Sequence, residues 1–192
     1  MLWAAFLTCF FGFMRSGEMC GQETQTGDQT ADLTYHDVAV DDIANPRRIQ
    51  LHLKKSKTDV FRQGASIHIG RTDDDLCPVA ALLSWMIRRG SQPGPLFTWA
   101  SGKALTRSTF VTKLREALEE AGIDSRGFSG HSFRSGAATT AATRGITDHQ
   151  IKQLGRWKSS AYLRYIKPSA QHLASVAKVL STHTHTGTHI QK

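Results

Sequence analysis

Residues 131–142 read HSFRSGAATTAA, and residues 154–166 read LGRWKSSAYLRYI. The first stretch predicts a helix that is rich in Ala and Thr. His131 and Arg134 stand three residues apart at its start, on one face and beside the free N–H groups of the first turn. This position suits a phosphate, because the helix end attracts an anion and arginine offers a planar, two-pronged donor. Taken alone, a His-x-x-Arg pair is a weak signal and is more often structural.

The remaining sequence predicts a mainly α fold with a small antiparallel β-sheet, that is, an α+β domain. Residues 1 to about 20 are strongly apolar and predict a helix. Three alternating runs separated by turn-forming residues predict the strands, at 33–40, 48–53 and 65–69. Helical periodicity follows, with capping residues and terminal glycines. The expected helices span 78–89, 106–121, about 132–143, 147–154, about 160–166 and 168–180.

Length and composition fit one sizeable globular domain. The chain has 192 residues, of which 40% are hydrophobic and 21% charged, and this is enough to bury a core without disulfide bonds. Cys9, Cys20 and Cys77 show no metal-ligand spacing and predict buried thiols in a reducing compartment. The apolar start, residues 1–14, lacks a basic leading segment and is too short to span a membrane, so it predicts a buried helix.

Charge is distributed unevenly along the chain. The net charge is +8, and residues 126–192 hold ten Lys or Arg against the single acidic residue Asp148. This last third therefore carries +9 and residues 1–125 carry −1, which favours a polyanionic partner bound through the C-terminal part. A solvated basic surface is the alternative. The Thr- and His-rich residues 181–192 predict a disordered tail, with metal binding by its histidines as the alternative.

Five short motifs occur in order: Arg15 in FFGFMRSGEM, Lys57 in KKSKTD, HSFR at 131–134, LGRW at 154–157, and Tyr165. This series resembles the active-site residues of tyrosine recombinases, the phage-integrase family. The resemblance extends from residue 1 to about 180. The two stretches quoted first are particularly similar to recombinases of eukaryotic mobile elements of the DIRS, Ngaro and Crypton kinds. Each motif is weak alone, and the order of all five makes the match specific.

The resemblance implies an enzyme that cuts and rejoins DNA through a phosphotyrosine. It implies that Arg15 and Arg134 hold the non-bridging oxygens of the scissile phosphate, where charge builds in the transition state. His131 accepts a proton or binds the phosphate. Lys57 protonates the departing 5′ oxygen, and Tyr165 attacks phosphorus and holds the 3′ end. Because the phosphotyrosine conserves the bond energy, the family needs no metal, ATP or other nucleotide cofactor.

The sequence departs from the family at its LGH-like turn, where Arg156 stands in place of the histidine. Either the following Trp157 donates its N–H to the phosphate from a shifted turn, which we favour, or the guanidinium of Arg156 replaces the histidine. Arg156 and Lys158 are also expected to contact DNA. Tyr165 lies nine residues after position 156, the usual spacing in the family, and Tyr162 is the rival nucleophile one turn earlier.

Structural interpretations stand beside these roles. Arg15 could pair with Glu18, one turn on, as a surface salt bridge. Lys57 follows Lys54 and Lys55 in the sequence and could belong to a solvated, charged turn. The ring of Trp157 could be part of the core.

The resemblance also implies an organisation and partners. Residues 1–180 are expected to form the catalytic domain, with the family's N-terminal core-binding domain absent. The expected partners are double-stranded DNA and further copies of the chain, in the nucleus and without a membrane. The helix at 168–180 is a candidate interface between copies, with packing inside one copy as the alternative. Two other functions remain open: an inactive or host-adopted DNA-binding module, and a protein-interaction domain with a basic face.

Overall fold

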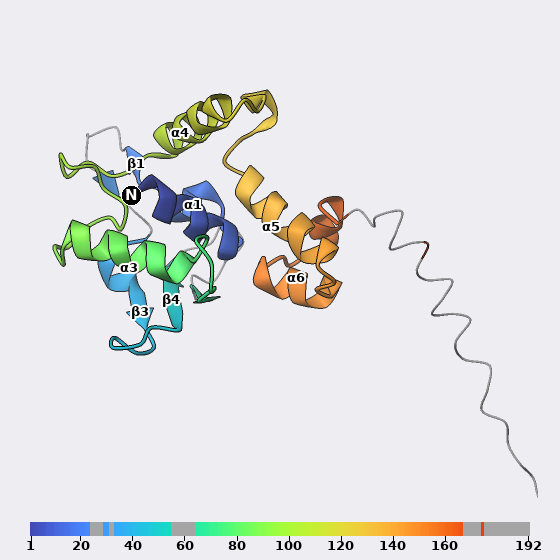
Figure 1. The fold of residues 1–192 in the computed structure, drawn as a ribbon, viewed down its shortest axis with the longest axis horizontal. Helices are drawn as coiled ribbons and strands as arrows, with labels where there is room; N and C mark the ends of the chain where they lie inside the picture. Colours follow the sequence, from blue (N-terminus) through green and yellow to red (C-terminus); the bar gives the residue numbers. More distant parts are fainter. Residues whose placement is uncertain (24–28, 31–32, 55–63, 167–173, 175–192) are drawn as a thin grey trace, which may run out of the picture.

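The computed structural model describes residues 1–23, 29–30, 33–54, 64–166 and Ala174 (Figure 1). Helix α1 (Leu2–Phe11) is central in this part of the chain and contacts both α3 (Pro78–Arg89) and α5 (Ser132–Thr143). No helix in the described ranges has the length and apolar character needed to cross a membrane. The mainly helical fold with a small antiparallel sheet is confirmed.

The apolar first twenty residues form two helices, and the prediction of one continuous helix is wrong. Helix α1 ends at Phe11 and the short α2 spans Ser16–Met19. Between them Phe13 adopts a left-handed backbone conformation with φ of 49°, which an α-helix cannot contain. The carboxylate of Glu18 then accepts the backbone N–H of Arg15 at 2.8 Å and caps the start of α2. This break places Arg15 at a helix start.

The antiparallel sheet has the order β3-β4-β5, with β3 at Val38–Val40, β4 at Arg48–Leu53 and β5 at Ala65–Gly70. Burial alternates along β4 and β5, so that one face of the sheet packs on the core. The first strand is shorter than expected because Tyr35–Asp37 forms a 3₁₀ turn, η1. A second pair of short strands, β1 (Gln22–Glu23) and β2 (Gln29–Thr30), was not predicted.

The helices after the sheet follow the sequence pattern. Helix α4 spans Arg107–Glu120 and is capped at its N-terminus by Thr106. Helix α6 spans Asp148–Leu154 and is capped by Thr147. A 3₁₀ turn, η2 (Ser125–Gly127), connects α4 to α5. The helix expected at about 160–166 is instead a 3₁₀ helix, η3, at Ser160–Arg164. The expected 168–180 helix, apart from Ala174, and the 181–192 tail lie outside the described residues.

Two hydrophobic clusters hold the described residues together. The larger one joins α1, α3 and the buried face of the sheet, and includes Leu51, Leu82 and Phe110. The smaller one consists of Phe13, Ala137, Ala138 and Ile151, and packs against aromatic residues of the 154–166 segment. The turn at residues 12–15 connects the two clusters, and the candidate active site forms around it.

Candidate active site

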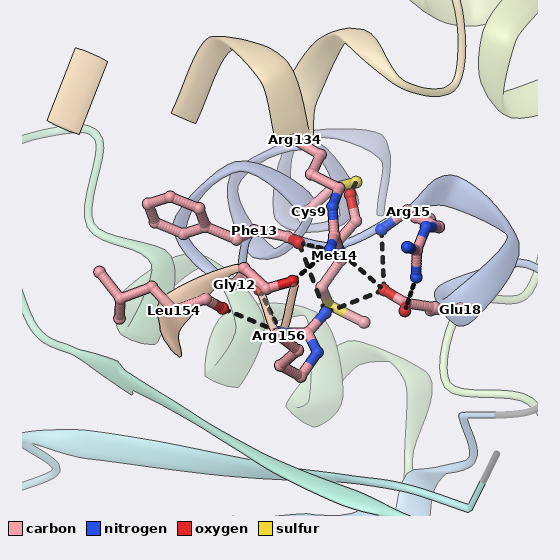
Figure 2. Close-up of polar contacts among 10 residues, drawn as sticks. Cys9, Gly12, Phe13, Met14, Arg15, Glu18, Arg134, Leu154 and Arg156 are labelled. Atoms are coloured by element: carbon pink, nitrogen blue, oxygen red, sulfur yellow. Dashed lines mark hydrogen bonds and ion pairs between the residues drawn. The ribbon is translucent and has the colours of Figure 1, made fainter. Parts of the chain in front are cut away.

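Three arginines from distant parts of the chain surround the carboxylate of Glu18 (Figure 2). Oε1 accepts Nη1 of Arg15 at 3.0 Å, and Oε2 accepts Nη2 of Arg156 at 3.0 Å. Nη1 of Arg134 lies 3.9 Å from Oε2. The Glu18 side chain is only 6% exposed. We call these four residues the arginine cluster; one buried carboxylate faces three guanidinium groups, which leaves an excess of two positive charges.

Arg134 is the most deeply buried arginine of the cluster. Its Nη1 donates to the carbonyl of Phe13 at 3.0 Å, and its Nη2 donates to the carbonyl of Gly155. These bonds tie the end of α1 to the end of α6. Burial, reinforced by the positive charge of Arg15, lowers the pKa of Arg134 to about 10. A nearby anion would offset this cost of burying the charge.

Arg156 points inward from a left-handed turn, with φ of 56°. Its Nη1 donates to the carbonyls of Gly12 at 3.1 Å and Leu154 at 3.2 Å, and its Nη2 also approaches the carbonyl of Phe13 at 3.4 Å. Its buried Nε has no partner among the described residues. Burial lowers the pKa of this guanidinium, and the Glu18 carboxylate partly opposes the shift. Arg156 therefore fastens the 154–157 turn to α1.

The indole of Trp157 lies between the buried Arg134 and two tyrosines. Cζ of Arg134 lies 4.3 Å from the centroid of the Trp157 ring, a cation–π contact. The rings of Tyr162 and Tyr165 lie 6.1 and 6.0 Å from it on a centroid-to-centroid measure. A Cβ at position 155 would fall on the Trp157 ring, so that only glycine fits at this turn.

Tyr165 ends η3 and is half-buried against the smaller hydrophobic cluster. Its carbonyl accepts the hydroxyl of Thr139 in α5 at 2.8 Å, which fixes the backbone of the tyrosine to that helix. The tyrosine is also close enough to Arg134 to affect the pKa of the guanidinium.

His131 precedes α5 and has an exposed side chain. The residue before it, Gly130, packs on Ser16: a Cβ at position 130 would fall on the Ser16 hydroxyl, and the Ser16 N–H donates to the Gly130 carbonyl at 3.3 Å. Because Ser16 follows Arg15 in sequence, this contact brings the backbone of His131 near that of Arg15.

The structure thus groups most of the residues singled out from the sequence. Arg15, Arg134, Arg156, Trp157 and Tyr165 come together, with His131 beside them. Lys158 is exposed. Lys57 lies outside the described residues.

Sequence reasoning missed the role of two residues. Glu18 was considered only as a surface partner of Arg15, whereas its carboxylate is buried and shared. It is the single acidic residue among residues 1–20, and this was a usable signal. Thr139, a polar residue in an Ala-rich stretch, anchors Tyr165. In the described ranges no three His, Cys, Asp or Glu side chains form a possible metal site.

The helical fold, the antiparallel sheet and the arrangement of arginines near a tyrosine together resemble the catalytic domains of tyrosine recombinases. Residues 12–172 match the phage integrase family, and the chain belongs to that family. It is 31% identical over 130 residues to an integrase/recombinase xerD homolog of Selenomonas ruminantium, an alignment that covers 64% of this chain and 38% of the relative.

Solved structures show the same fold. XerH site-specific recombinase bound to a palindromic difH substrate superimposes with a TM-score of 0.67 at 16% identity, over 93% of this chain and 45% of XerH. The Tn1549 transposon integrase in complex with transposon right end DNA gives a TM-score of 0.56 at 17% identity, over 93% of this chain and 58% of the integrase. The chain spans less than half the length of the xerD homolog and of XerH.

Proposed function

We propose that this chain cleaves and rejoins DNA strands through a 3′-phosphotyrosine on Tyr165. The observation that carries the proposal is the arginine cluster, where three guanidinium groups face one carboxylate beside a tyrosine. An excess of two positive charges next to a nucleophile suits a phosphodiester, because its non-bridging oxygens gain charge as the bond to phosphorus forms. The proposal is supported by the xerD homolog, which is named as an integrase/recombinase, and by XerH and the Tn1549 integrase, whose structures were solved with DNA.

Arg15 is the member of the cluster best placed to bind the phosphate. Its side chain is 24% exposed, and one of its nitrogens, Nη1, donates to Glu18. The carboxylate therefore fixes the guanidinium while other donors remain at the surface. Arg134 lies deeper and contributes charge and support from below. Such preorganised donors stabilise a transition state without rearranging during the reaction.

The proposed chemistry conserves the bond energy. The oxygen of Tyr165 attacks phosphorus and forms the phosphotyrosine, and the bond from phosphorus to the 5′ oxygen breaks. His131 accepts the tyrosine proton or binds the phosphate, and Lys57 gives a proton to the departing 5′ oxygen. Attack by a 5′ hydroxyl reverses these steps and rejoins the strand. The proposal requires no metal, ATP or other cofactor.

The geometry supports Trp157 over Arg156 as the further donor to the phosphate. The guanidinium of Arg156 already donates to carbonyls at the end of α1 and to Glu18. The ring of Trp157 lies beside Tyr165. We therefore assign the indole N–H to the phosphate, and we assign Arg156 to positioning of the turn, where its charge also attracts DNA. Lys158, exposed on the same turn, is proposed as a DNA contact.

The wider setting is part of the proposal. We infer that residues 1–180 form the catalytic domain, that double-stranded DNA is the substrate, and that several copies assemble on paired sites. From the resemblance of residues 131–142 and 154–166 we further propose that the activity belongs to a eukaryotic mobile element of the DIRS, Ngaro or Crypton kind and acts in the nucleus. The basic C-terminal third supplies the attraction to DNA.

A second candidate function is DNA binding without turnover. It is favoured by the engagement of Arg134, whose two hydrogen bonds among the described residues go to main-chain carbonyls. In that case the cluster would hold a phosphate without promoting attack on it.

Covalent trapping separates the two functions. The chain is incubated, with EDTA and without nucleotide, with nicked duplexes of mixed sequence labelled at their 5′ ends, and is then denatured. Catalysis predicts label that stays on the protein after denaturation and is removed by protease. Retarded migration of the native complex together with no denaturation-resistant label would support the binding function instead.

A further inference from the structure

Arg107, the first residue of α4, lies beside the proposed active site. Its Nε is 3.5 Å from the place that a Cβ at position 130 would occupy, and the Ser16 hydroxyl adjoins the same place. Gly130 precedes His131 and Ser16 follows Arg15, so Arg107 borders the two backbone segments that carry these site residues. Burial raises the pKa of Cys20, at the end of α2, to about 12, and the positive charge of Arg107 partly opposes this shift. Both observations place Arg107 next to α2.

Arg107 is exposed, and within the described ranges no hydrogen bond or ion pair joins its side chain to another residue. The other basic residues of α4 differ in this respect. Lys113 pairs with Glu116 at 2.5 Å, and Nε of Arg115 donates to the carbonyl of Phe128 at 3.0 Å. Arg107 is thus the basic residue of α4 whose guanidinium has no bond within the described structure.

The position of Arg107 on its helix is unfavourable for helix stability. A cation in the first turn meets the positive end of the helix dipole and the unpaired N–H groups there. The capping of α4 is supplied by Thr106, whose hydroxyl accepts the N–H of Thr109 at 3.2 Å. Arg107 therefore gains nothing from the helix itself, and an anion placed beside it would relieve the repulsion.

We propose that Arg107 binds a DNA phosphate adjacent to the one held by Arg15 and His131. This inference rests on the proposed function and extends its site along the DNA strand. An exposed guanidinium offers a planar fork that matches two phosphate oxygens. Because the contact is to the backbone, it adds affinity and positions the strand without reading its sequence. Arg107 is thus a binding residue, separate from the residues that contact the reacting atoms.

The test is the salt dependence of DNA binding. Affinity of the full 192-residue chain for a fluorescein-labelled duplex of mixed sequence is measured by anisotropy over a series of KCl concentrations. The variants are Arg107→Gln, Arg107→Lys and the matched control Lys113→Gln, which removes the same charge from the same helix. A plot of log affinity against log salt has a negative slope, and each lost phosphate contact makes this slope less steep by about 0.9.

The proposal expects Arg107→Gln to lower the slope by about 0.9, while Arg107→Lys and Lys113→Gln keep the wild-type slope. An Arg107→Gln slope equal to that of wild type, or an equal loss in Lys113→Gln, would overturn it. If wild type and Arg107→Gln bind DNA alike and both still form the Tyr165 adduct, this inference fails and the proposed function stands. Absence of salt-dependent DNA binding by wild type would overturn both this inference and the proposed function.

Discussion

The guanidinium of Arg134 lies over the indole ring of Trp157, with Cζ 4.3 Å from the ring centroid. These residues stand at the start of α5 and after the end of α6, and the same arginine donates to the carbonyls of Phe13 and Gly155. The contact connects the arginine cluster to the ring that neighbours Tyr165. Support for the cluster and placement of the tyrosine are therefore physically coupled.

Replacing the Trp157 ring should weaken both the support of the arginine cluster and the placement of Tyr165. Trp157→Leu removes a cation–π contact to a buried guanidinium and part of its packing, and we expect the free energy of unfolding to fall by about 1–3 kcal/mol. Trp157→Phe should lose less, because it keeps an aromatic face. Urea denaturation measures the difference. Trp3→Leu is the control: Trp3 is 53% exposed, and its loss should stay within about 0.5 kcal/mol. Equal effects at the two positions would refute the coupling.

Substitutions of Arg15 and Arg134, the two arginines of the proposed phosphate site, should differ in their effects. Arg15→Ala removes a half-buried donor, and we expect strand cleavage to slow by about 10²–10³-fold with the fold intact. Arg134→Ala leaves the Gly155 carbonyl without its donor and the Phe13 carbonyl with only the 3.4 Å contact from Arg156. This should also cost about 1–3 kcal/mol of unfolding free energy. Adduct formation and thermal denaturation, measured on the same samples, check this. Arg126→Ala serves as the control, because Arg126 pairs with Asp124 at the surface. Unfolding by Arg15→Ala would contradict the assignment.

Glu18 should stabilise the site by offsetting the three guanidinium charges. Glu18→Gln keeps the shape and removes the charge, and we expect a loss of about 3–5 kcal/mol, the usual cost of leaving buried charges unpaired. Added sulfate should recover part of this loss, since an oxyanion can occupy the positive cluster. Glu116→Gln, which breaks the partly exposed pair with Lys113, should cost about 0–1 kcal/mol and show no specific sulfate effect. Urea denaturation of both variants, with and without sulfate, measures these differences in unfolding free energy.

A pH dependence follows from Cys20. Burial raises the pKa of this thiol from 9.0 to about 12. Between these values the folded chain keeps the proton and the unfolded chain releases it, so this group's contribution to stability is complete below pH 9 and falls as the pH rises toward 12. The unfolding free energy of wild type should therefore decline relative to that of Cys20→Ala in this window. A constant difference between the two proteins across the window would show that the thiol is not buried as described.

Local sequence rules predicted the elements well where local forces decide them. The capping residues Thr106 and Thr147, and the alternation in 48–53, gave the observed helix starts and strand. The break at Phe13 escaped prediction because the apolar run continues across it. The left-handed backbone is held by the local bond from the Met14 N–H to the Cys9 carbonyl at 2.9 Å and by the tertiary bond from Arg134 to the Phe13 carbonyl.

The site shows the same division. Motif order singled out Arg15, Arg134 and Tyr165, which the fold brings together. It could not reveal that Arg156 turns inward or that Glu18 is shared by several arginines, since both depend on contacts between residues far apart in the sequence, such as Arg156 with Gly12 and Glu18 with Arg134 and Arg156. The sequence does not tell which side chain of a motif such as LGRW faces the arginine cluster, because the packing of the folded chain decides this.

The most direct test of the central claim compares two tyrosines that flank the same ring. Tyr162 and Tyr165 lie at nearly equal distances from Trp157, so Tyr162→Phe is a matched control for Tyr165→Phe. Both variants and wild type are incubated with 5′-labelled nicked duplexes and denatured. The account predicts protein-bound label in wild type and Tyr162→Phe and none in Tyr165→Phe. Label that persists in Tyr165→Phe and disappears in Tyr162→Phe would contradict it.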